Sequence, residues 1–367
     1  MSERTRNQYI PDHVSAPGET LQEILETRGM SQAELADRTG RPKKTINEII
    51  KGKAAITPET ALQLELVLGA PASFWNSRES QYREALAGAK GKQLLETQTD
   101  WLENIPYRAM AKLGWVPDWR EKVKQLQEVL MFFGVASPDR WDDVWKGPAA
   151  AFRLSPTLAS DPGAVAAWLR KGEVEAQKIQ CAEYNQARFK VALSRIRALT
   201  WSLPREVPSI VRRECAAAGV RLVFVPELPG TRAWGATRWS TQTSATIQLS
   251  LRYKTDDHLW FTFFHEAGHV LLHGKRDVFL EIDEVEPDEK EREADSFALD
   301  WLIPAKEYRA FKRLGTPSCA GVSRFAHQVG IAAGIVVGRL QHDGLLPRTD
   351  CNNLKKRVDW MLAGGNE

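Results

Sequence analysis

The run His265-Glu266-Ala267-Gly268-His269 constrains the fold of this chain more than any other feature. Its two histidines are four residues apart, and residues at that spacing lie one above the other on a helix face. Two imidazoles placed in this way can bind one metal ion, and the glutamate between them can act as a base on water. Apolar stretches at 260–264 and 270–272 flank the run and predict a buried helix. The sequence therefore predicts a metal centre on this helix.

A downstream acidic segment supplies the third protein ligand that catalytic zinc sites usually have. Glu291 and Asp295 are four residues apart and share a helix face. We expect Glu291 to bind the metal and Asp295 to accept a hydrogen bond from a ligand histidine, preferably His265. Glu293 is the alternative ligand, although it points about 160° around the helix from Glu291. The other carboxylates from 281 to 295 are expected in a solvated loop and helix start.

Residues from about 207 to 347 resemble the ImmA/IrrE family of zinc-dependent, gluzincin-like metallopeptidases. The matching motifs are Phe264-His265-Glu266-Ala267-Gly268-His269-Val270-Leu271-Leu272-His273, Glu291-x-x-Ala294-Asp295-x-Phe297-Ala298 and Leu302-Ile303-Pro304. The resemblance implies a Zn²⁺ ion at the predicted metal centre, with Glu266 as the catalytic base, and limited proteolysis of a repressor. Many family members have asparagine where this chain has Asp295, and either side chain can accept the expected hydrogen bond.

Further residues near the motif are candidates for stabilising an oxyanion or holding the substrate. They are His258, His273, Tyr253 and Arg238. His258 shares the helix face of His265 at a distance of about 10 Å along the axis, and a structural role is the alternative for each of the four. A strand over 245–251 could also bind a substrate peptide by strand addition.

The predicted fold class is α+β and mostly α. Three β-branched runs precede the metal-binding helix and predict a small antiparallel sheet: 219–225, 233–239 and 245–251. Asp256 or Asp257 is expected to cap the helix that follows. We therefore expect an N-terminal all-α helix-turn-helix bundle, a helical middle domain and a C-terminal gluzincin-like metallopeptidase domain with a small sheet.

Short helices that end at glycines occupy the segment from residue 18 to about 86. Ser31 and Glu34 form a capping box, and Gly40 then joins two helices into a helix-turn-helix, whose second helix can enter the major groove. Ile46 and Ile49 are expected in the core, so that polar and basic residues face outward. The DNA-binding candidates are Gln32, Arg41, Lys43, Lys44, Thr45, Asn47, Lys51 and Lys53. The alternative is a helical bundle with a solvated basic face.

This segment resembles the HigA type of antitoxin within the lambda-repressor-like helix-turn-helix class. The resemblance rests on Pro17-Gly18-Glu19-Thr20-Leu21, Met30-Ser31-Gln32-Ala33-Glu34-Leu35-Ala36, Ile46-Asn47-Glu48-Ile49-Ile50-Lys51-Gly52-Lys53, Ile56-Thr57-Pro58-Glu59-Thr60-Ala61-Leu62 and Phe74-Trp75-Asn76. It implies an operator-binding repressor that forms a homodimer on double-stranded operator DNA and that could neutralise a partner toxin.

The length of 367 residues suits two or three domains. We expect a hinge at 87–92, and we place a helix-turn-helix domain at 1–92, a helical middle domain at 93–200, the metallopeptidase domain at 201–347 and a tail at 348–367. The many tryptophans of the middle segment are interpreted as core residues rather than as platforms for stacking nucleic-acid bases.

Cysteine usage and hydropathy predict a cytoplasmic protein. The four cysteines are scattered without a CxxC pair, so reduced thiols are expected. The N-terminal residues lack the apolar core of a secretory signal, and no stretch is long and apolar enough to span a bilayer. No membrane partner is therefore expected.

Together these features predict a DNA-binding transcriptional regulator, an antitoxin-like repressor, with a zinc-dependent endopeptidase domain. The endopeptidase would cleave a regulatory protein or partner. The alternative is a non-proteolytic antitoxin or repressor whose peptidase-like domain only binds or senses a partner.

Overall fold

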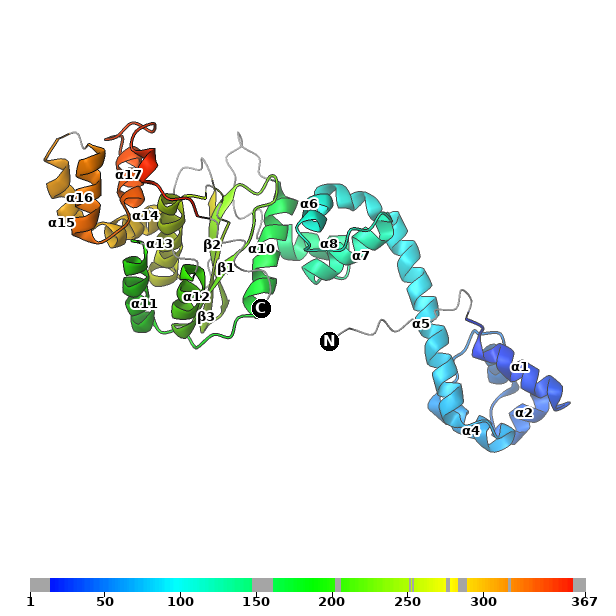
Figure 1. Ribbon diagram of the computed structural model, residues 1–367. Helices are drawn as coiled ribbons and strands as arrows, with labels where there is room; N and C mark the ends of the chain where they lie inside the picture. Colours follow the sequence, from blue (N-terminus) through cyan, green and yellow to red (C-terminus); the bar gives the residue numbers. More distant parts are fainter. Residues whose placement is uncertain are drawn as a thin grey trace. The chain divides into compact units, whose positions relative to one another are not determined.

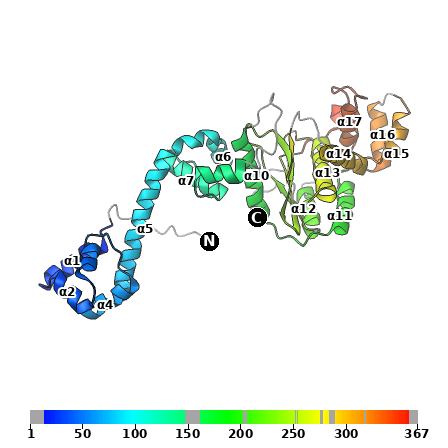
Figure 2. The same ribbon diagram turned by 180° about the vertical axis from the view of Figure 1, so that it is seen from behind.

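The computed structural model describes residues 14–146, 161–201, 206–250, 252, 254–274, 278–282, 289–315 and 318–358. The chain divides into two compact units, Met1–Thr99 and Asp100–Glu367. Each unit is a folded body of its own, and the ribbon views from the front and from behind trace its helices and strands (Figures 1 and 2).

From residue 14 onward, the regular elements of the first unit are all helices. Its elements are α1 (Pro17–Thr27), α2 (Gln32–Thr39), α3 (Lys43–Ile50), α4 (Pro58–Leu68) and α5 (Ala72–Thr97). The serine half of the predicted capping box of α2 is confirmed, because Ser31 Oγ accepts the N–H of Glu34 at 3.1 Å, whereas the Glu34 carboxylate pairs with Arg38 at 2.6 Å. Gly40, which follows α2, has a φ of 69°, a backbone conformation that favours glycine. The helix-turn-helix predicted around Gly40 is therefore present.

Close helix packing holds the first unit together. A Cβ atom on Gly18 would overlap the carbonyl of Ile49, so α1 and α3 can approach only because residue 18 lacks a side chain. The carboxylate of Glu79 on α5 accepts the N–H of Ile56 at 3.1 Å and ties α5 to the loop before α4. Residues 87–92, expected as a hinge, are a continuous part of α5, because its alanines and lysines favour a helix and offset two glycines.

The second unit begins with small helices packed around aromatic rings. They are η1 (Thr99–Asn104), α6 (Tyr107–Lys112), α7 (Lys122–Phe133), α8 (Pro138–Trp141) and η2 (Asp142–Lys146). The rings of Phe133 and Trp141 are 5.7 Å apart, and Trp145 donates its indole N–H to the carbonyl of Phe133 at 3.2 Å. The tryptophans at 141 and 145 are buried, which confirms their interpretation as core residues, whereas Trp119 is 41% exposed and the interpretation is wrong for it.

A four-stranded mixed sheet forms the centre of the second unit. Its strands are β1 (Val220–Phe224), β2 (Ala233–Thr241), β3 (Ser244–Leu249) and β4 (Val278–Ile282), in the order β1-β3-β2-β4. The pairs β2–β3 and β2–β4 are antiparallel, whereas β1 and β3 are parallel. The expectation of a wholly antiparallel sheet is wrong. The strand β3 lies between β1 and β2, and it pairs with β1 in parallel rather than in antiparallel orientation. The acidic stretch that was expected as a loop contributes the end of β4.

Helices cover both faces of this sheet (Figure 1). On one face lies α10 (Pro162–Gln177), where Trp168 donates its indole N–H to Val225 and accepts from Gln248 through its carbonyl. On the other face lie α12 (Val207–Ala217) and α13 (Asp256–Leu272). The residues of α10 were expected in the helical middle domain. In the structure, the hydrogen bonds of Trp168 join this helix to the sheet.

Further helices complete the unit around α13. They are α11 (Gln186–Leu199), α14 (Glu289–Leu302), α15 (Ala305–Lys312), α16 (Cys319–Val329), α17 (Ala333–His342) and η3 (Asn352–Leu354). Among the described residues, no single helix is long and apolar enough to cross a membrane, and only α16 and α17 together pass that test, as a pair bent by 116°.

The start of α13 is held by the segment 355–358. Asp256 donates its N–H to the carbonyl of Lys356 at 2.9 Å, and Lys355 forms an ion pair with Asp257 at 2.6 Å. The expected capping role of these aspartates is wrong, because the N-cap is Thr255. The Asp256 carboxylate instead accepts hydrogen bonds from the backbone N–H groups of Asp257 and Lys356, and the side chain is buried.

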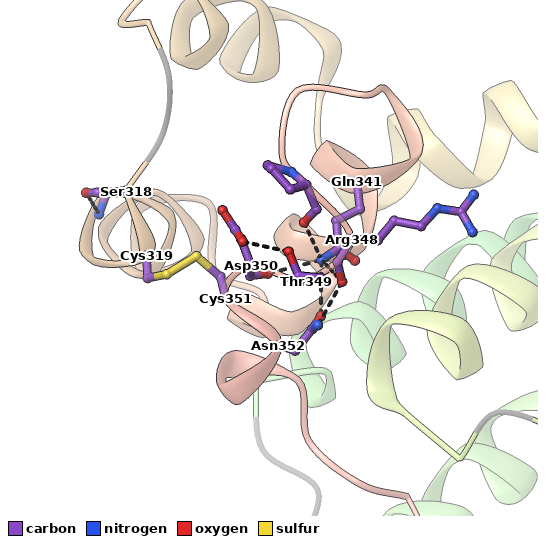
Figure 3. The surroundings of a disulfide bond; sticks show 10 residues. Ser318, Cys319, Gln341, Arg348, Thr349, Asp350, Cys351 and Asn352 are labelled. Atoms are coloured by element: carbon purple, nitrogen blue, oxygen red, sulfur yellow. Dashed lines mark hydrogen bonds between the residues drawn. A yellow bond between two sulfur atoms is a disulfide. The ribbon is translucent and has the colours of Figure 1, made fainter.

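A disulfide joins Cys319, the first residue of α16, to Cys351 just before η3 (Figure 3). Close by, Gln341 of α17 donates to the carbonyl of Asp350 at 3.1 Å. Cys181 and Cys215 are free. The expectation of four reduced thiols is therefore wrong for one pair, because the fold brings together two cysteines that are 32 residues apart.

The variant Cys351→Ser is expected to lower the free energy of unfolding of the second unit by about 3 to 4 kcal/mol, because the crosslink closes a 32-residue loop. Denaturant unfolding followed by circular dichroism without reductant measures this loss. Cys181→Ser is the matched control and should behave as wild type. Identical unfolding midpoints for wild type and Cys351→Ser would contradict the crosslink.

Burial raises the pKa of Asp256 to about 6, from an ordinary value of 3.8. The neutral carboxyl stabilises the fold below pH 4, and this contribution is lost as the pH rises through 6. Asp256→Asn keeps the acceptor oxygen and removes the titration. Relative to this variant, the free energy of unfolding of wild type should fall by up to about 3 kcal/mol between pH 4 and 7, since a shift of one pKa unit corresponds to about 1.4 kcal/mol.

Denaturant midpoints of wild type and Asp256→Asn, measured at each pH, check this expectation. Asp300→Asn, at an exposed position on α14, is the control and should follow wild type. Two parallel profiles for wild type and Asp256→Asn would show that the buried carboxyl does not titrate in this range.

Candidate metal centre and DNA-binding helices

Two helices bring three potential metal ligands together. His265 and His269 lie on α13 and are buried, and their Nε2 atoms are 2.9 Å apart. Glu291 of α14 places Oε2 at 3.0 Å from Nε2 of His265 and at 3.4 Å from Nε2 of His269. The helices can approach because a Cβ on Gly268 would already lie 3.2 Å from Cα of Ala294. The structure thus groups the three residues predicted as ligands.

The donor set suits zinc. Among the residues that the structure describes, His265, His269 and Glu291 form a group whose ligand atoms all lie within 4.8 Å of one another. A tetrahedral zinc site with bonds of about 2.0 to 2.1 Å has donor atoms about 3.3 Å apart. The observed separations of 2.9 to 3.4 Å are close to this value. Two imidazole nitrogens and a carboxylate oxygen also match the donor types of catalytic zinc sites.

The electrostatics of the group favour metal-binding protonation states. Burial raises the pKa of Glu291, but hydrogen bonds with His265 and His269 outweigh this effect and lower the pKa to about 2. Burial lowers the pKa of His269. At neutral pH the carboxylate is therefore ionised and this imidazole is neutral, so that each can offer a lone pair.

Asp295 and Glu293 lie in different surroundings on α14. Asp295 Oδ1 is 2.9 Å from Nδ1 of His265, so the hydrogen-bond partner expected for this ligand is present. Glu293 is outside the ligand group, and its carboxylate is 3.0 Å from Nε2 of His273. The geometry therefore favours Glu291 over Glu293 as the metal ligand.

Glu266 points from α13 toward β2. A Cβ on Gly235 would overlap the Glu266 carboxylate, and Thr237 donates its hydroxyl to the Glu266 carbonyl at 3.0 Å. The carboxylate is thus held against a strand whose backbone leaves space for it. Sequence reasoning did not select Gly235, although a glycine inside a strand can mark a close approach of this kind.

Arg238 and His273 do not lie where an oxyanion donor is needed. On β2, Thr237 faces α13, so its neighbour Arg238 faces the opposite side of the sheet, opposite Thr246 and toward Glu173 of α10. Nδ1 of His273 is 2.9 Å from Nδ1 of His269, behind the nitrogen that faces the ligand group. These contacts do not support the oxyanion role expected for either residue.

The remaining substrate candidates are placed differently. The ring of His258 is 4.9 Å from Trp234, and both line a cavity of about 300 Å³ beside Asp295. Tyr253 lies outside the described residues. The strand expected to accept a peptide is β3, which is buried in the middle of the sheet. The edge strand near the ligands is β4, whose Phe279 stacks on His269 at 4.0 Å.

The helix-turn-helix presents its basic residues to solvent. Ile46 and Ile49 are buried, as predicted, and the lysines at 43, 44, 51 and 53 are exposed. Lys44 is 3.8 Å from Glu48, one turn further along α3. Exposed cations around the second helix are the arrangement expected for phosphate contacts.

The other DNA-binding candidates make contacts within the first unit. Asn47 donates to Gln32 at 3.1 Å, which joins α3 to the start of α2. Arg41 donates to Gln63 of α4 at 2.7 Å, and Thr45 is half-buried. The structure therefore brings Gln32 and Asn47 together and ties Arg41 to α4.

Comparison with known families matches two parts of the chain. A helix-turn-helix family matches residues 21–75, and the IrrE N-terminal-like domain matches residues 215–340. The second match contains β1 to β4 together with α13, α14 and the three candidate ligands. The matched regions therefore include both the helix-turn-helix and the three candidate ligands.

Relatives of this chain include an uncharacterized HTH-type transcriptional regulator, YddM, of Escherichia coli (strain K12). It is 32% identical over 71 residues, which are 19% of this chain and 76% of that protein. A solved structure, an addiction module antidote protein of a HigA family from Coxiella burnetii, is 29% identical. The match covers 23% of this chain and 94% of that one, with a TM-score of 0.22. The chain belongs to the helix-turn-helix transcriptional regulators, and it carries an IrrE N-terminal-like domain in its second unit.

Proposed function

We propose that this DNA-binding regulator is also a zinc-dependent endopeptidase that cleaves a regulatory protein. The observation that carries the proposal is the convergence of two imidazoles and one carboxylate, with Glu266 on the same helix and its carboxylate held against Gly235. This combination provides three ligands and a separate base, which is the composition of a catalytic zinc site.

The residues divide the chemistry of peptide hydrolysis among them. Zinc held by His265, His269 and Glu291 would lower the pKa of water toward neutrality and polarise the scissile carbonyl. Glu266 takes the proton from the attacking water and passes it to the leaving amine. Asp295 accepts the Nδ1 proton of His265, so that Nε2 of this ring presents its lone pair to the ligand group.

An extended substrate segment fits the edge of the sheet. The sheet order places β4 at the edge, and Phe279 on this strand contacts His269. A peptide that adds to β4 by backbone hydrogen bonds would lie beside the ligand group. We therefore assign to β4 the peptide-binding role that the sequence suggested for 245–251.

The helix-turn-helix unit suggests what kind of protein is cleaved. A reader of operator DNA acts as a homodimer on a palindromic site, where other regulators also assemble. A peptidase in the same chain would meet such a regulator, or a partner toxin, at high local concentration. We propose a cytoplasmic regulatory protein bound at or near the operator as the substrate.

Glu266→Gln is expected to keep zinc and to slow cleavage by about 10² to 10⁴ fold, because the base is lost while the ligands remain. The full-length variant serves as bait in a pull-down that captures the uncleaved substrate, and elemental analysis measures its zinc. Glu307→Gln, on α15 and outside the ligand group, is the control and should cleave as wild type.

Undiminished cleavage by Glu266→Gln would exclude this residue as the base. Wild type that holds zinc and cleaves no captured partner would favour the non-proteolytic antitoxin or repressor.

Lys43→Glu with Lys44→Glu is expected to abolish a gel shift on the promoter of the chain's own gene. Both lysines are exposed at the start of α3, and charge reversal replaces attraction to phosphate by repulsion. With both lysines replaced by alanine, the slope of log affinity against log salt should fall by about 1 per lysine. Lys90→Glu with Lys92→Glu, exposed on α5, makes the same charge change and is the control. Equal shifts for wild type and the Lys43/Lys44 reversal would move the DNA contact to another surface.

A further inference from the structure

The two candidate histidine ligands are held in different ways. His265 meets a carboxylate directly, through Nδ1 and Asp295 Oδ1 at 2.9 Å. His269 instead meets a third imidazole, with 2.9 Å between its Nδ1 and Nδ1 of His273. The other nitrogen of His273 is 3.0 Å from Oε2 of Glu293 on α14. Among the residues that the structure describes, Nδ1 of His269 thus reaches a carboxylate through His273.

The positions of the protons along this chain follow from the hydrogen bonds. A metal takes the lone pair of Nε2 of His269, so the proton of this ring must be on Nδ1. Nδ1 of His273 must then accept that proton's hydrogen bond, which places the proton of His273 on Nε2. Glu293, as a carboxylate, accepts from Nε2. One arrangement of two neutral rings thus satisfies every contact.

The opposite arrangement would disable His269 as a ligand. If His273 carried its proton on Nδ1, it would donate to Nδ1 of His269, and the proton of His269 would move to Nε2. That nitrogen faces the ligand group and would have no lone pair for a metal. Glu293 opposes this arrangement, because a carboxylate next to Nε2 of His273 requires a proton there.

Packing keeps both rings in place. The side chain of His273 is 4% exposed, whereas that of Glu293 is 56% exposed. The ring of Phe279 on β4 stacks on His269 at 4.0 Å and lies 5.1 Å from His273. The ring of His269 therefore packs against Phe279. Its Nε2 faces the ligand group, and its Nδ1 contacts His273.

We propose that His273 and Glu293 are positioning residues that hold His269 in the tautomer and ring orientation needed to bind the metal. This inference rests on the proposed zinc site. It gives His273 a role other than oxyanion donor and gives Glu293 a role other than ligand. Partners of ligand histidines typically change metal affinity by about 10 to 100 fold when they are removed, so the effect is measurable.

Competition with a chromophoric zinc chelator tests the inference on the full-length protein. His273→Leu should weaken zinc binding by about 10 to 100 fold, because Nδ1 of His269 loses its acceptor. His273→Asn should restore affinity close to that of wild type, because its Oδ1 is two bonds from Cβ, as Nδ1 is in histidine. Equal affinities for wild type and His273→Leu, or equal losses in both His273 variants, overturn the role of His273.

Glu293 has its own matched set of variants. Glu293→Leu should also weaken zinc binding, but by less than His273→Leu does. Water can reach this exposed position and accept the hydrogen bond of His273 in place of the carboxylate. Glu293→Gln, which keeps an acceptor oxygen, and Glu289→Leu, at the exposed start of α14, should bind zinc as wild type does. Wild-type affinity in Glu293→Leu overturns the part assigned to Glu293.

Two further measurements separate this inference from the proposed function. His269→Ala should lose the zinc site, and if wild type and His269→Ala bind zinc equally, the proposed centre itself is wrong. Long-range ¹⁵N–¹H spectra of the imidazoles in the zinc-loaded protein report the tautomers. A proton on Nε2 of His273 and on Nδ1 of His269 supports the positioning role, and a proton on Nδ1 of His273 overturns it.

Discussion

The close approach of α13 and α14 is the contact on which the candidate centre depends. It is possible because Gly268 and Ala294, which face one another, have almost no side chain between the helix axes. The same approach brings Glu291 to both histidines, Asp295 to the back of one histidine and Glu293 to His273. A bulkier residue at either position would separate all of these pairs at once, because they share two rigid helices.

Helical spacing carried most of what the sequence could reveal about the centre. The four-residue intervals between His265 and His269, and between Glu291 and Asp295, determine faces within single helices, which the structure reproduces. Contacts between elements were harder to foresee. The pairing of His273 with Glu293, for example, needs the relative rotation of two helices, and neither residue's own helix determines that rotation.

The sheet shows the same limit. Three of its strands were predicted from β-branched runs, yet their order was not, and this order decides which strand is at the edge and that β1 runs parallel to β3. Arg238 was misplaced for a related reason: neighbouring strand residues face opposite sides, and the sequence did not show which side α13 would cover. The disulfide also depends on tertiary structure, because the folded helices bring Cys319 close to Cys351.

The pairing of segment 355–358 with the start of α13 lets residues 100 positions further along the chain hold the helix that carries the candidate ligands. Protein chains emerge from the ribosome N-terminus first, and domains generally fold as units in that order. The helix-turn-helix unit can therefore fold while the second unit still lacks the contacts that segment 355–358 makes. A product that stops short of Lys355 would keep the reader and leave Asp257 of α13 without its ion-pair partner. In this chain, the helix-turn-helix is therefore synthesised before the residues that complete the contacts of α13.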